Sequence, residues 1–173
     1  YLYKNHRELF DRITEKLKHR VPGIESVDSK ITEEGRVLLR FKDGSFEDPF
    51  LARHVSDGTI KMFAYLVLLH DPAPHPLLCV EEPENQLYPK LLAELAEEFR
   101  DYARKGGQVF VSTNSPDFLN ACNLDEVFWL KKSDGYTEVK RASEDEQIRA
   151  YLDDGDTLGA LWRQGFFDGA DPE

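Results

Sequence analysis

The chain has 173 residues, of which 40% are apolar and 32% charged, a composition typical of one globular domain with its own core. No apolar run approaches the roughly 20 residues that a membrane helix needs, which excludes a helical membrane protein. Acidic residues outnumber basic ones by 33 to 22, and the net charge of −11 argues against a broad nucleic-acid surface on this chain alone.

The two cysteines and the first residue of the chain indicate the compartment of the protein and whether the chain is a fragment. Cys79 and Cys122 form neither a disulfide framework nor a metal-ligand spacing, so we expect both to be reduced and the protein to be cytoplasmic. We also expect no export signal, since no charged and then apolar leader follows Tyr1. Because the first residue is not Met, we expect this chain to be a piece of a longer protein.

The first 42 residues predict a helix and a small antiparallel element. Apolar residues about four positions apart over 3–21 predict a half-buried helix, which Pro22 and Gly23 end. Strands are expected at 24–32 and 36–42, with a hairpin turn between them.

The middle of the chain predicts a parallel unit. Residues 56–69 are apolar on nearly all sides and predict a mostly buried helix. Short apolar runs at 77–80 and 108–112 predict buried strands, and the period of apolar residues over 92–103 predicts a helix between them. A strand, a helix and a strand of these lengths predict a parallel crossover.

The last third predicts further strands at 126–130 and 137–140, then helices at 144–152 and 158–163. Trp129 and Trp162 are expected in a core, since few basic residues interleave with them as in a base-stacking surface. The predicted fold is therefore α/β, with a mostly parallel sheet flanked by helices and a small antiparallel element near the N-terminus.

Two carboxylates directly follow the strand at 77–80. Pro83 directs the chain out of the sheet there, at the edge where such folds bind ligands. Glu81 could hold Mg²⁺ together with waters and phosphates, and Glu82 could deprotonate an attacking water. A solvated acidic turn explains this segment equally well when it is taken alone.

Two other segments carry polar groups suited to phosphate. Ser56, Asp57 and Gly58 open the buried helix, whose free N–H groups and dipole attract anions, although an ordinary serine cap is the simpler interpretation. Asn114 follows the strand at 108–112 and is expected at the same edge as the two acids. Ser115 and the following proline fit an ordinary capped helix.

The order and spacing of these segments carry more information than each alone. VSDGT, LLCVEEPENQLYP and STNSPDF resemble the signature motif, the Walker B strand with its turn, and the switch strand of ABC-superfamily ATPases. The likeness is to the RecF- and SMC-related group of AAA-type ATPases, which includes the ATPase domains of OLD-family nucleases, and it covers about residues 50–120. It implies a P-loop NTPase fold in which residues 1–173 form the C-terminal portion of the ATPase domain.

The resemblance implies a role for each matching residue, with ATP and Mg²⁺ as cofactors. Glu81 would hold Mg²⁺ through water, and Glu82 would be the general base. The signature residues Ser56, Asp57 and Gly58 would contact the γ-phosphate of ATP bound to a second subunit in a head-to-tail homodimer. The turn at 85–89 would touch that subunit.

Three positions depart from the family pattern. Asn114 and Tyr88 stand where the family has histidines, and an amide can donate a hydrogen bond to phosphate but cannot share a proton as imidazole does. We expect a slower or more ATP-retaining cycle. Lys61 stands where the family often has Arg and is either a phosphate contact or, more simply, a solvated lysine.

The 173 residues contain no GxxxxGK[ST] loop, which cradles the phosphates in this class. We therefore expect this chain alone to be inactive and to need the N-terminal half of the same ATPase. The implied function is ATP hydrolysis that drives a DNA-maintenance or anti-phage-type effector, with DNA contacts through other regions left open and no membrane partner. The alternatives are a non-hydrolysing nucleotide-sensing scaffold and a DNA-binding or nuclease-associated module.

Overall fold

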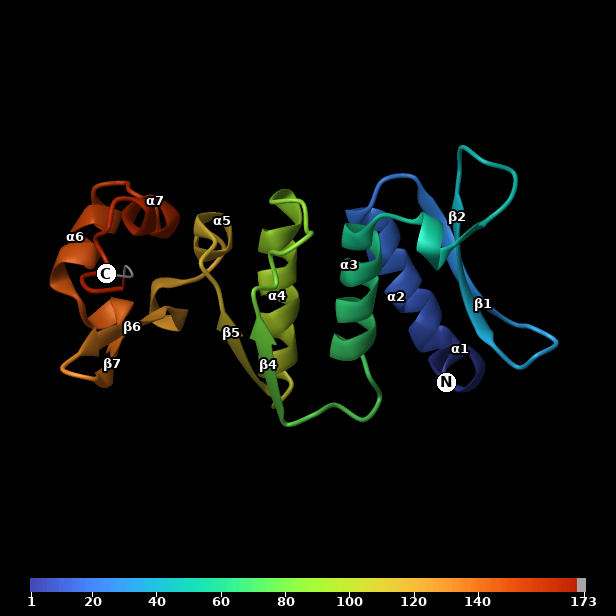
Figure 1. Ribbon diagram of the computed structural model, residues 1–173, viewed down its shortest axis with the longest axis horizontal. Helices are drawn as coiled ribbons and strands as arrows, with labels where there is room; N and C mark the ends of the chain where they lie inside the picture. Colours follow the sequence, from blue (N-terminus) through green and yellow to red (C-terminus); the bar gives the residue numbers. More distant parts are fainter. Residues whose placement is uncertain (171–173) are drawn as a thin grey trace.

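A computed structural model describes residues 1–170, whose elements follow one another along an elongated molecule (Figure 1). The chain begins with α1 (Leu2–Asn5) and α2 (Arg7–Arg20), so the helix expected over 3–21 is interrupted. The interruption is His6, whose backbone leaves the helical region at φ −135° and ψ 55°.

The small antiparallel element is confirmed. Strands β1 (Ile24–Ile31) and β2 (Val37–Asp43) pair as a hairpin, and Gly35 in the connecting turn has a φ of +79°, which favours glycine. A third strand, β3 (Phe50–Leu51), pairs with β2 and was not predicted, because two residues are too short to show a pattern.

The buried helix is also confirmed, as α3 (Asp57–Leu69), which follows a 3-10 turn at Ala52–His54. Ser56 caps α3, since its Oγ accepts a hydrogen bond from the backbone N–H of Thr59 at 3.3 Å. The buried side of α3 packs with α2 and α4 in the larger of two hydrophobic cores. Its members there include Met62, Phe63, Leu66 and Leu69.

The parallel crossover comprises β4 (Leu77–Glu81), α4 (Lys90–Arg104) and β5 (Gln108–Ser112), as predicted. The carboxyl ends of both strands and the N-terminus of α3 point to the same side of the molecule, the top of Figure 1. One face of this two-stranded sheet belongs to the large core, through Leu78, Val80, Val109 and Val111. The other face is exposed and carries Leu77, Cys79 and Phe110.

The remaining elements form the end of the molecule around a second core. They are α5 (Pro116–Leu119), 3-10 turns at Leu124–Glu126 and Ala142–Glu144, β6 (Phe128–Ser133), β7 (Tyr136–Arg141), α6 (Glu146–Asp153) and α7 (Leu158–Arg163). Strands β6 and β7 pair antiparallel. Trp129 packs edge-on against Phe167 in this core, with ring centroids 5.4 Å apart, and Trp162 packs beside them, as predicted.

The fold is thus α/β, with a parallel pair of strands, antiparallel strands and flanking helices. Within the described residues the parallel part has two strands, β4 and β5. Among the same residues, no helix is both long and apolar enough to cross a membrane.

Candidate functional site

The site centres on the segment that leaves β4, residues 82–87, which we call the carboxylate turn. Glu81 ends β4 directly opposite Ser112 of β5, and the N–H of Glu82 donates to the Ser112 carbonyl at 2.8 Å. Glu82 and Gln86 both have positive φ, 41° and 66°. Each such residue costs about 1–3 kcal/mol and persists only where surrounding contacts hold it. The contacts around this turn therefore hold its conformation.

The side chain of Glu82 is held from within the turn and its backbone from outside it. Asn85 Nδ2 donates to Glu82 Oε2 at 2.8 Å. From α3, Lys61 Nζ donates to the Asn85 carbonyl at 2.8 Å and lies 3.5 Å from the Glu82 carbonyl. Lys61 therefore donates hydrogen bonds to the backbone of the turn and is not the simply solvated lysine that the sequence favoured.

Glu84 connects the carboxylate turn to the end of β5. Its Oε1 accepts hydrogen bonds from Thr113 Oγ1 at 2.7 Å and from the Asn114 N–H at 3.3 Å. Its Oε2 is buried and has no hydrogen-bond partner among residues 1–170. Glu84 lies within the LLCVEEPENQLYP segment, but no role was predicted for it from the sequence.

The start of α3 packs directly on the carboxylate turn. A Cβ placed on Gly58 would lie 2.5 Å from the Gln86 carbonyl oxygen, so only glycine fits there. The sequence suggested that glycine at position 58 lets a phosphate approach the backbone. The close packing on Gln86 is a second reason for this glycine, which the sequence did not reveal. Ser56 Oγ lies 2.8 Å from Thr59 Oγ1, so in this state the serine acts as a helix cap.

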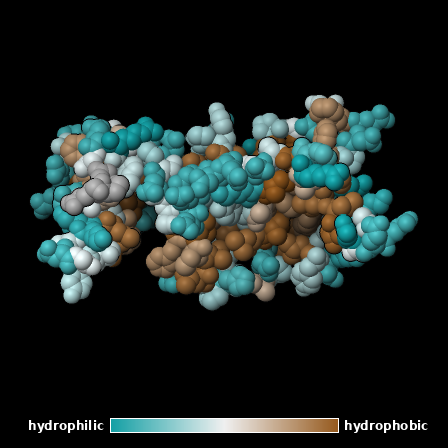
Figure 2. Space-filling view, in the orientation of Figure 1, coloured by the Kyte–Doolittle hydropathy of each residue, from teal (hydrophilic) through white to brown (hydrophobic). Residues whose placement is uncertain are grey.

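Three of the predicted site residues share one cavity. Glu81, Glu82 and Asn114 line a space of about 1020 Å³ between β5 and β6, while Ser56, Asp57 and Gly58 are absent from its lining and pack on the carboxylate turn through Gly58. Much of the lining is apolar, and Figure 2 shows hydrophobic surface around β4 and β5. Phe110, Phe128, Leu130 and Val139 line it and are 63%, 55%, 62% and 65% exposed.

The carboxylates suit a hard cation. Among residues 1–170 no group of three or more His, Cys, Asp or Glu side chains is arranged to hold a metal ion. Mg²⁺ needs no such group, because it commonly uses one or two carboxylates together with waters and substrate phosphates. Glu81 offers an exposed carboxylate at the end of β4, which fits that coordination.

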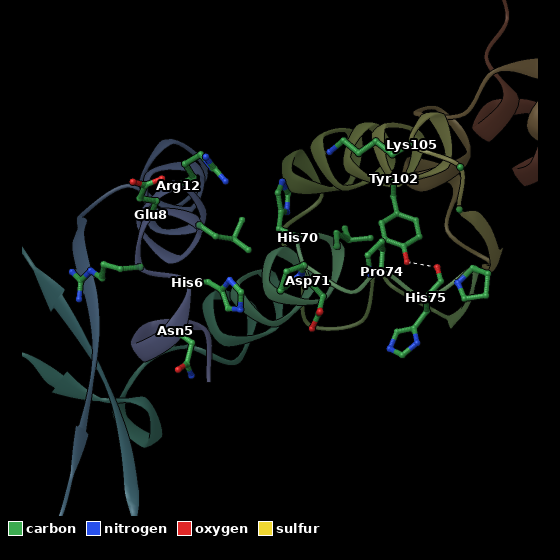
Figure 3. A pocket seen from close by; sticks show the side chains of 17 residues that line it. Asn5, His6, Glu8, Arg12, His70, Asp71, Pro74, His75, Tyr102 and Lys105 are labelled. Carbon is green, nitrogen blue, oxygen red and sulfur yellow. Dashed lines mark hydrogen bonds between the residues drawn. The ribbon is translucent and has the colours of Figure 1, made fainter.

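A second groove, of about 920 Å³, lies at the opposite edge of the parallel pair, beside the C-terminal ends of α3 and α4 (Figure 3). His70 and His75 line it, and Tyr102 donates from its hydroxyl to the His75 carbonyl. Burial lowers the pKa of His70, whose Nδ1 is 2.9 Å from the Leu66 carbonyl. None of the predicted site residues lines this groove.

The sequence matches, over residues 1–120, the model of a family described as "AAA domain, putative AbiEii toxin, Type IV TA system". Comparison with curated protein sequences finds no match.

Solved structures share the fold. One comes from work on "ATP-driven dimerization and DNA stimulated activation of SMC ATPases"; it is 15% identical with a TM-score of 0.62, and the alignment covers 90% of this chain and 96% of that one. An Smc head bound to the C-winged helix domain of ScpA is 17% identical with a TM-score of 0.59, covering 82% and 44%. An Smc head with coiled coil and joint from Pyrococcus yayanosii is 17% identical with a TM-score of 0.61, covering 88% and 30%.

The chain thus spans nearly all of one of these structures and less than half of the other two. The family model covers more than half of this chain and includes every predicted site residue. The chain therefore belongs to this family of AAA domains, and it shares the fold of SMC ATPase heads.

Proposed function

We propose that this chain supplies the metal carboxylate, the general base and the signature helix of an ATP-hydrolysing head. One observation carries the proposal: the parallel register sets Glu81 opposite Ser112, so that Glu81, Glu82 and Asn114 border one cavity at the carboxyl edge of the sheet. Ligands of doubly wound sheets bind at this edge. Here Glu81 would hold Mg²⁺, and Glu82 and Asn114 would face the γ-phosphate.

The proposed chemistry divides between neighbouring side chains. Mg²⁺ held by Glu81 would neutralise charge on the phosphates. Glu82 accepts a proton from the attacking water, with its Oε2 oriented by Asn85 at 2.8 Å. The amide of Asn114 donates to a phosphate oxygen but remains neutral, so product release and proton movement proceed without the imidazole of related proteins.

We further propose that the N-terminal half of the same ATPase completes the site, and that residues 1–173 are the C-terminal portion of that domain. The 173 residues contain no phosphate-binding loop. The exposed face of β4 and β5, with Leu77 and Phe110 48% and 63% exposed, offers apolar surface to such a half. This chain alone then neither binds ATP tightly nor hydrolyses it.

ATP-dependent homodimerisation is part of the same proposal. Ser56, Asp57 and Gly58 lie outside the cavity that holds the carboxylates, which suits contact with ATP on a second subunit. One SMC relative is described by its ATP-driven dimerisation and DNA-stimulated activation. By analogy the output is a DNA-maintenance or anti-phage-type effector in the cytoplasm.

The test uses the intact ATPase and its Glu82→Gln variant, with Glu144→Gln, on an exposed side chain far from the site, as the control. We expect Glu82→Gln to abolish turnover and to accumulate an ATP-bound dimer in size-exclusion chromatography, while Glu144→Gln behaves as wild type. Unchanged turnover in Glu82→Gln would refute the assignment of the base. For the chain alone, calorimetry should detect no micromolar binding of Mg-ATP.

The second candidate is a non-hydrolysing, nucleotide-sensing scaffold, which Asn114 favours because it replaces the switch histidine. In that case wild type and Glu82→Gln would both bind ATP and dimerise to the same extent, without turnover. Asn114→His separates the two candidates further. An ATPase with a slow cycle should turn over faster with the histidine, whereas a scaffold should not respond.

A further inference from the structure

The side chain of Lys61 links α3 to the backbone of the carboxylate turn. Its side chain leaves α3, crosses to the carboxylate turn and donates to the backbone carbonyl of Asn85 at 2.8 Å, with the Glu82 carbonyl 3.5 Å away. Its ammonium also lies 5.9 Å from the ring centroid of Tyr65, one helical turn further along α3. The ammonium therefore contacts the backbone of Glu82, the proposed general base, and of Asn85, whose side chain orients it.

Asn85 links that contact to the base itself. While its carbonyl accepts from Lys61, its side-chain amide donates to Glu82 Oε2 at 2.8 Å. The N–H of Asn85 also donates to the Glu82 carbonyl at 3.2 Å. A change in the position of the Asn85 backbone thus moves the donor that orients the Glu82 carboxylate.

The conformation of the turn needs such support. Glu82 and Gln86 both adopt positive φ, a conformation that side chains other than glycine rarely hold without outside contacts. The turn is supported from β5 by the hydrogen bond between Thr113 and Glu84, and from α3 by Lys61 and by the close packing of Gly58 on Gln86. Of these outside contacts, the one from Lys61 reaches the Glu82 and Asn85 carbonyls.

We propose that Lys61 is a positioning residue for the general base: it fixes the Asn85 backbone so that the Asn85 amide holds the Glu82 carboxylate. Since Lys61 lies one turn after Ser56 and Gly58 on the same helix, it also ties the signature segment to the base. A ligand that shifts the start of α3 would shift the base through this lysine. This inference rests on the proposed hydrolysis and goes beyond it by naming the residue that couples the two motifs.

The first test measures steady-state ATP hydrolysis by the intact ATPase with Lys61→Met and Lys61→Arg. Methionine keeps the apolar stem and removes the donors, so we expect kcat to fall about tenfold with KM changed less than about twofold. Arginine keeps a cation that donates hydrogen bonds and should restore most of kcat. In a double-mutant cycle, Asn85→Ala should add little to Lys61→Met, because both act on one contact chain.

Lys42 provides a matched control. Its ammonium also donates to two backbone carbonyls of a turn, those of Phe46 and Glu47, but at the end of β2, away from the site. Lys42→Met should cost a similar amount of stability in thermal unfolding and leave kcat unchanged. If Lys61→Met leaves kcat unchanged, or if both variants lower it equally, the proposal is overturned.

The second test is independent of turnover and uses the NMR signals of the Asn85 side-chain amide in this chain. We expect a separate, slowly exchanging pair in wild type and in Lys42→Met, and signals averaged toward those of free amides in Lys61→Met. If the intact wild-type ATPase does not hydrolyse ATP, the proposed function fails and this measurement alone decides the role of Lys61. If Lys61→Met leaves the Asn85 amide signals unchanged, the proposed role of Lys61 is overturned.

Discussion

Gly58 packs against the Gln86 carbonyl so closely that a Cβ on residue 58 would lie 2.5 Å from that oxygen. The obstacle is backbone, which cannot swing aside as a flexible side chain can. Gly58→Ala should therefore destabilise the chain by about 1–3 kcal/mol, the usual cost of overpacking. Urea denaturation measures the change, and Asp57→Ala on the exposed neighbouring position should cost less than about 1 kcal/mol. Equal stability of wild type and Gly58→Ala would mean that the turn moves freely away from α3.

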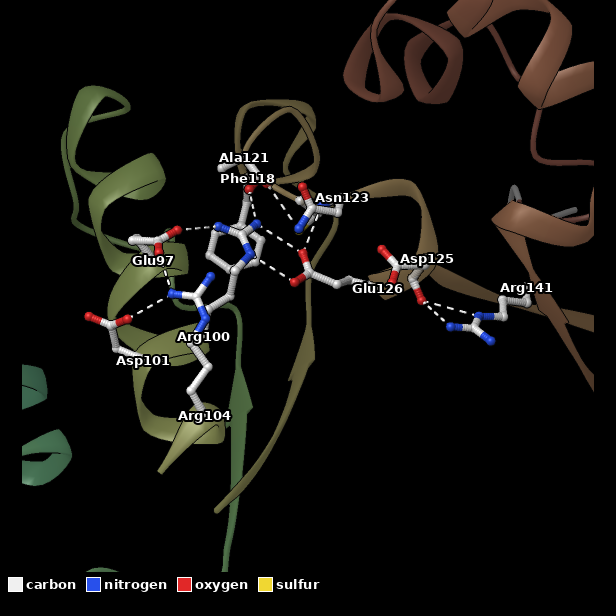
Figure 4. A network of polar contacts seen from close by, with 11 residues as sticks. Glu97, Arg100, Asp101, Arg104, Phe118, Ala121, Asn123, Asp125, Glu126 and Arg141 are labelled. Carbon is white, nitrogen blue, oxygen red and sulfur yellow. Dashed lines mark hydrogen bonds and ion pairs between the residues drawn. The ribbon is translucent and has the colours of Figure 1, made fainter. Parts of the chain in front are cut away.

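Arg100 joins α4 to the segment that leads into β6 (Figure 4). Its guanidinium donates to both carboxylate oxygens of Glu126, at 2.7 and 2.9 Å, and to the Ala121 carbonyl, and its side chain is 17% exposed. We expect Arg100→Met to lower the free energy of unfolding by about 1–2 kcal/mol. This loss is smaller than for a fully buried ion pair, because Glu126 is partly exposed to water.

Arg104 is the matched control for that change. It pairs with Glu97 and Asp101, both at 2.8 Å, but its side chain is 63% exposed. Surface pairs contribute little, so Arg104→Met should change stability by less than about 0.5 kcal/mol. If the two variants lose the same stability, the Arg100 network does not hold the C-terminal elements to α4.

The same network predicts a pH dependence. The hydrogen bond from Arg100 lowers the pKa of Glu126 below its ordinary value. A carboxylate with a depressed folded pKa stabilises above its unfolded pKa of about 4.3, and that stability is lost as pH falls through the folded value. Glu126→Gln should therefore be less stable than wild type by a constant amount between pH 6 and 8, with the gap closing in acid. Denaturation at several pH values checks this, and Glu33→Gln in the exposed hairpin turn should show no gap.

The parts of the structure that sequence predicts are those set by neighbouring residues. Ser56 caps α3, and the apolar period of α4 and the runs of β4 and β5 are local patterns. The strand expected at 126–130 begins later, because residues 124–126 tighten into a 3-10 turn in which Glu126 accepts from the Asn123 N–H at 2.8 Å. Boundaries of this kind depend on a single capping contact.

Sequence predicts which of the candidate site residues lie together, but not the contacts that hold them. That Glu81, Glu82 and Asn114 share an edge follows from strand order alone. The contact of Lys61 with Asn85 and the packing of Gly58 on Gln86 join segments 24 and 28 residues apart, and no local signal specifies them. Glu82 and Gln86 of the carboxylate turn also adopt positive φ, which residues other than glycine rarely do unless contacts from elsewhere hold them. Their identity alone therefore does not predict this conformation.

The two free cysteines differ in environment and should differ in reactivity. Burial raises the pKa of Cys122 to about 11, and its thiol donates to the Phe118 carbonyl at 3.4 Å. At pH 8 about one Cys122 in a thousand is then the thiolate, which is the reactive form. Cys79 is exposed on the outer face of β4.

We therefore expect a maleimide or disulfide reagent to label Cys79 of this chain rapidly and Cys122 slowly, with Cys79→Ser and Cys122→Ser identifying the two phases. If the N-terminal half of the ATPase covers the exposed face of β4, co-expression with that half should slow the Cys79 phase at least tenfold and leave the Cys122 phase unchanged. Because Cys79 lies on the sheet face and outside the carboxylate turn, this protection reports docking whether or not ATP is hydrolysed. Equal labelling of Cys79 with and without the N-terminal half would place that half elsewhere on the molecule.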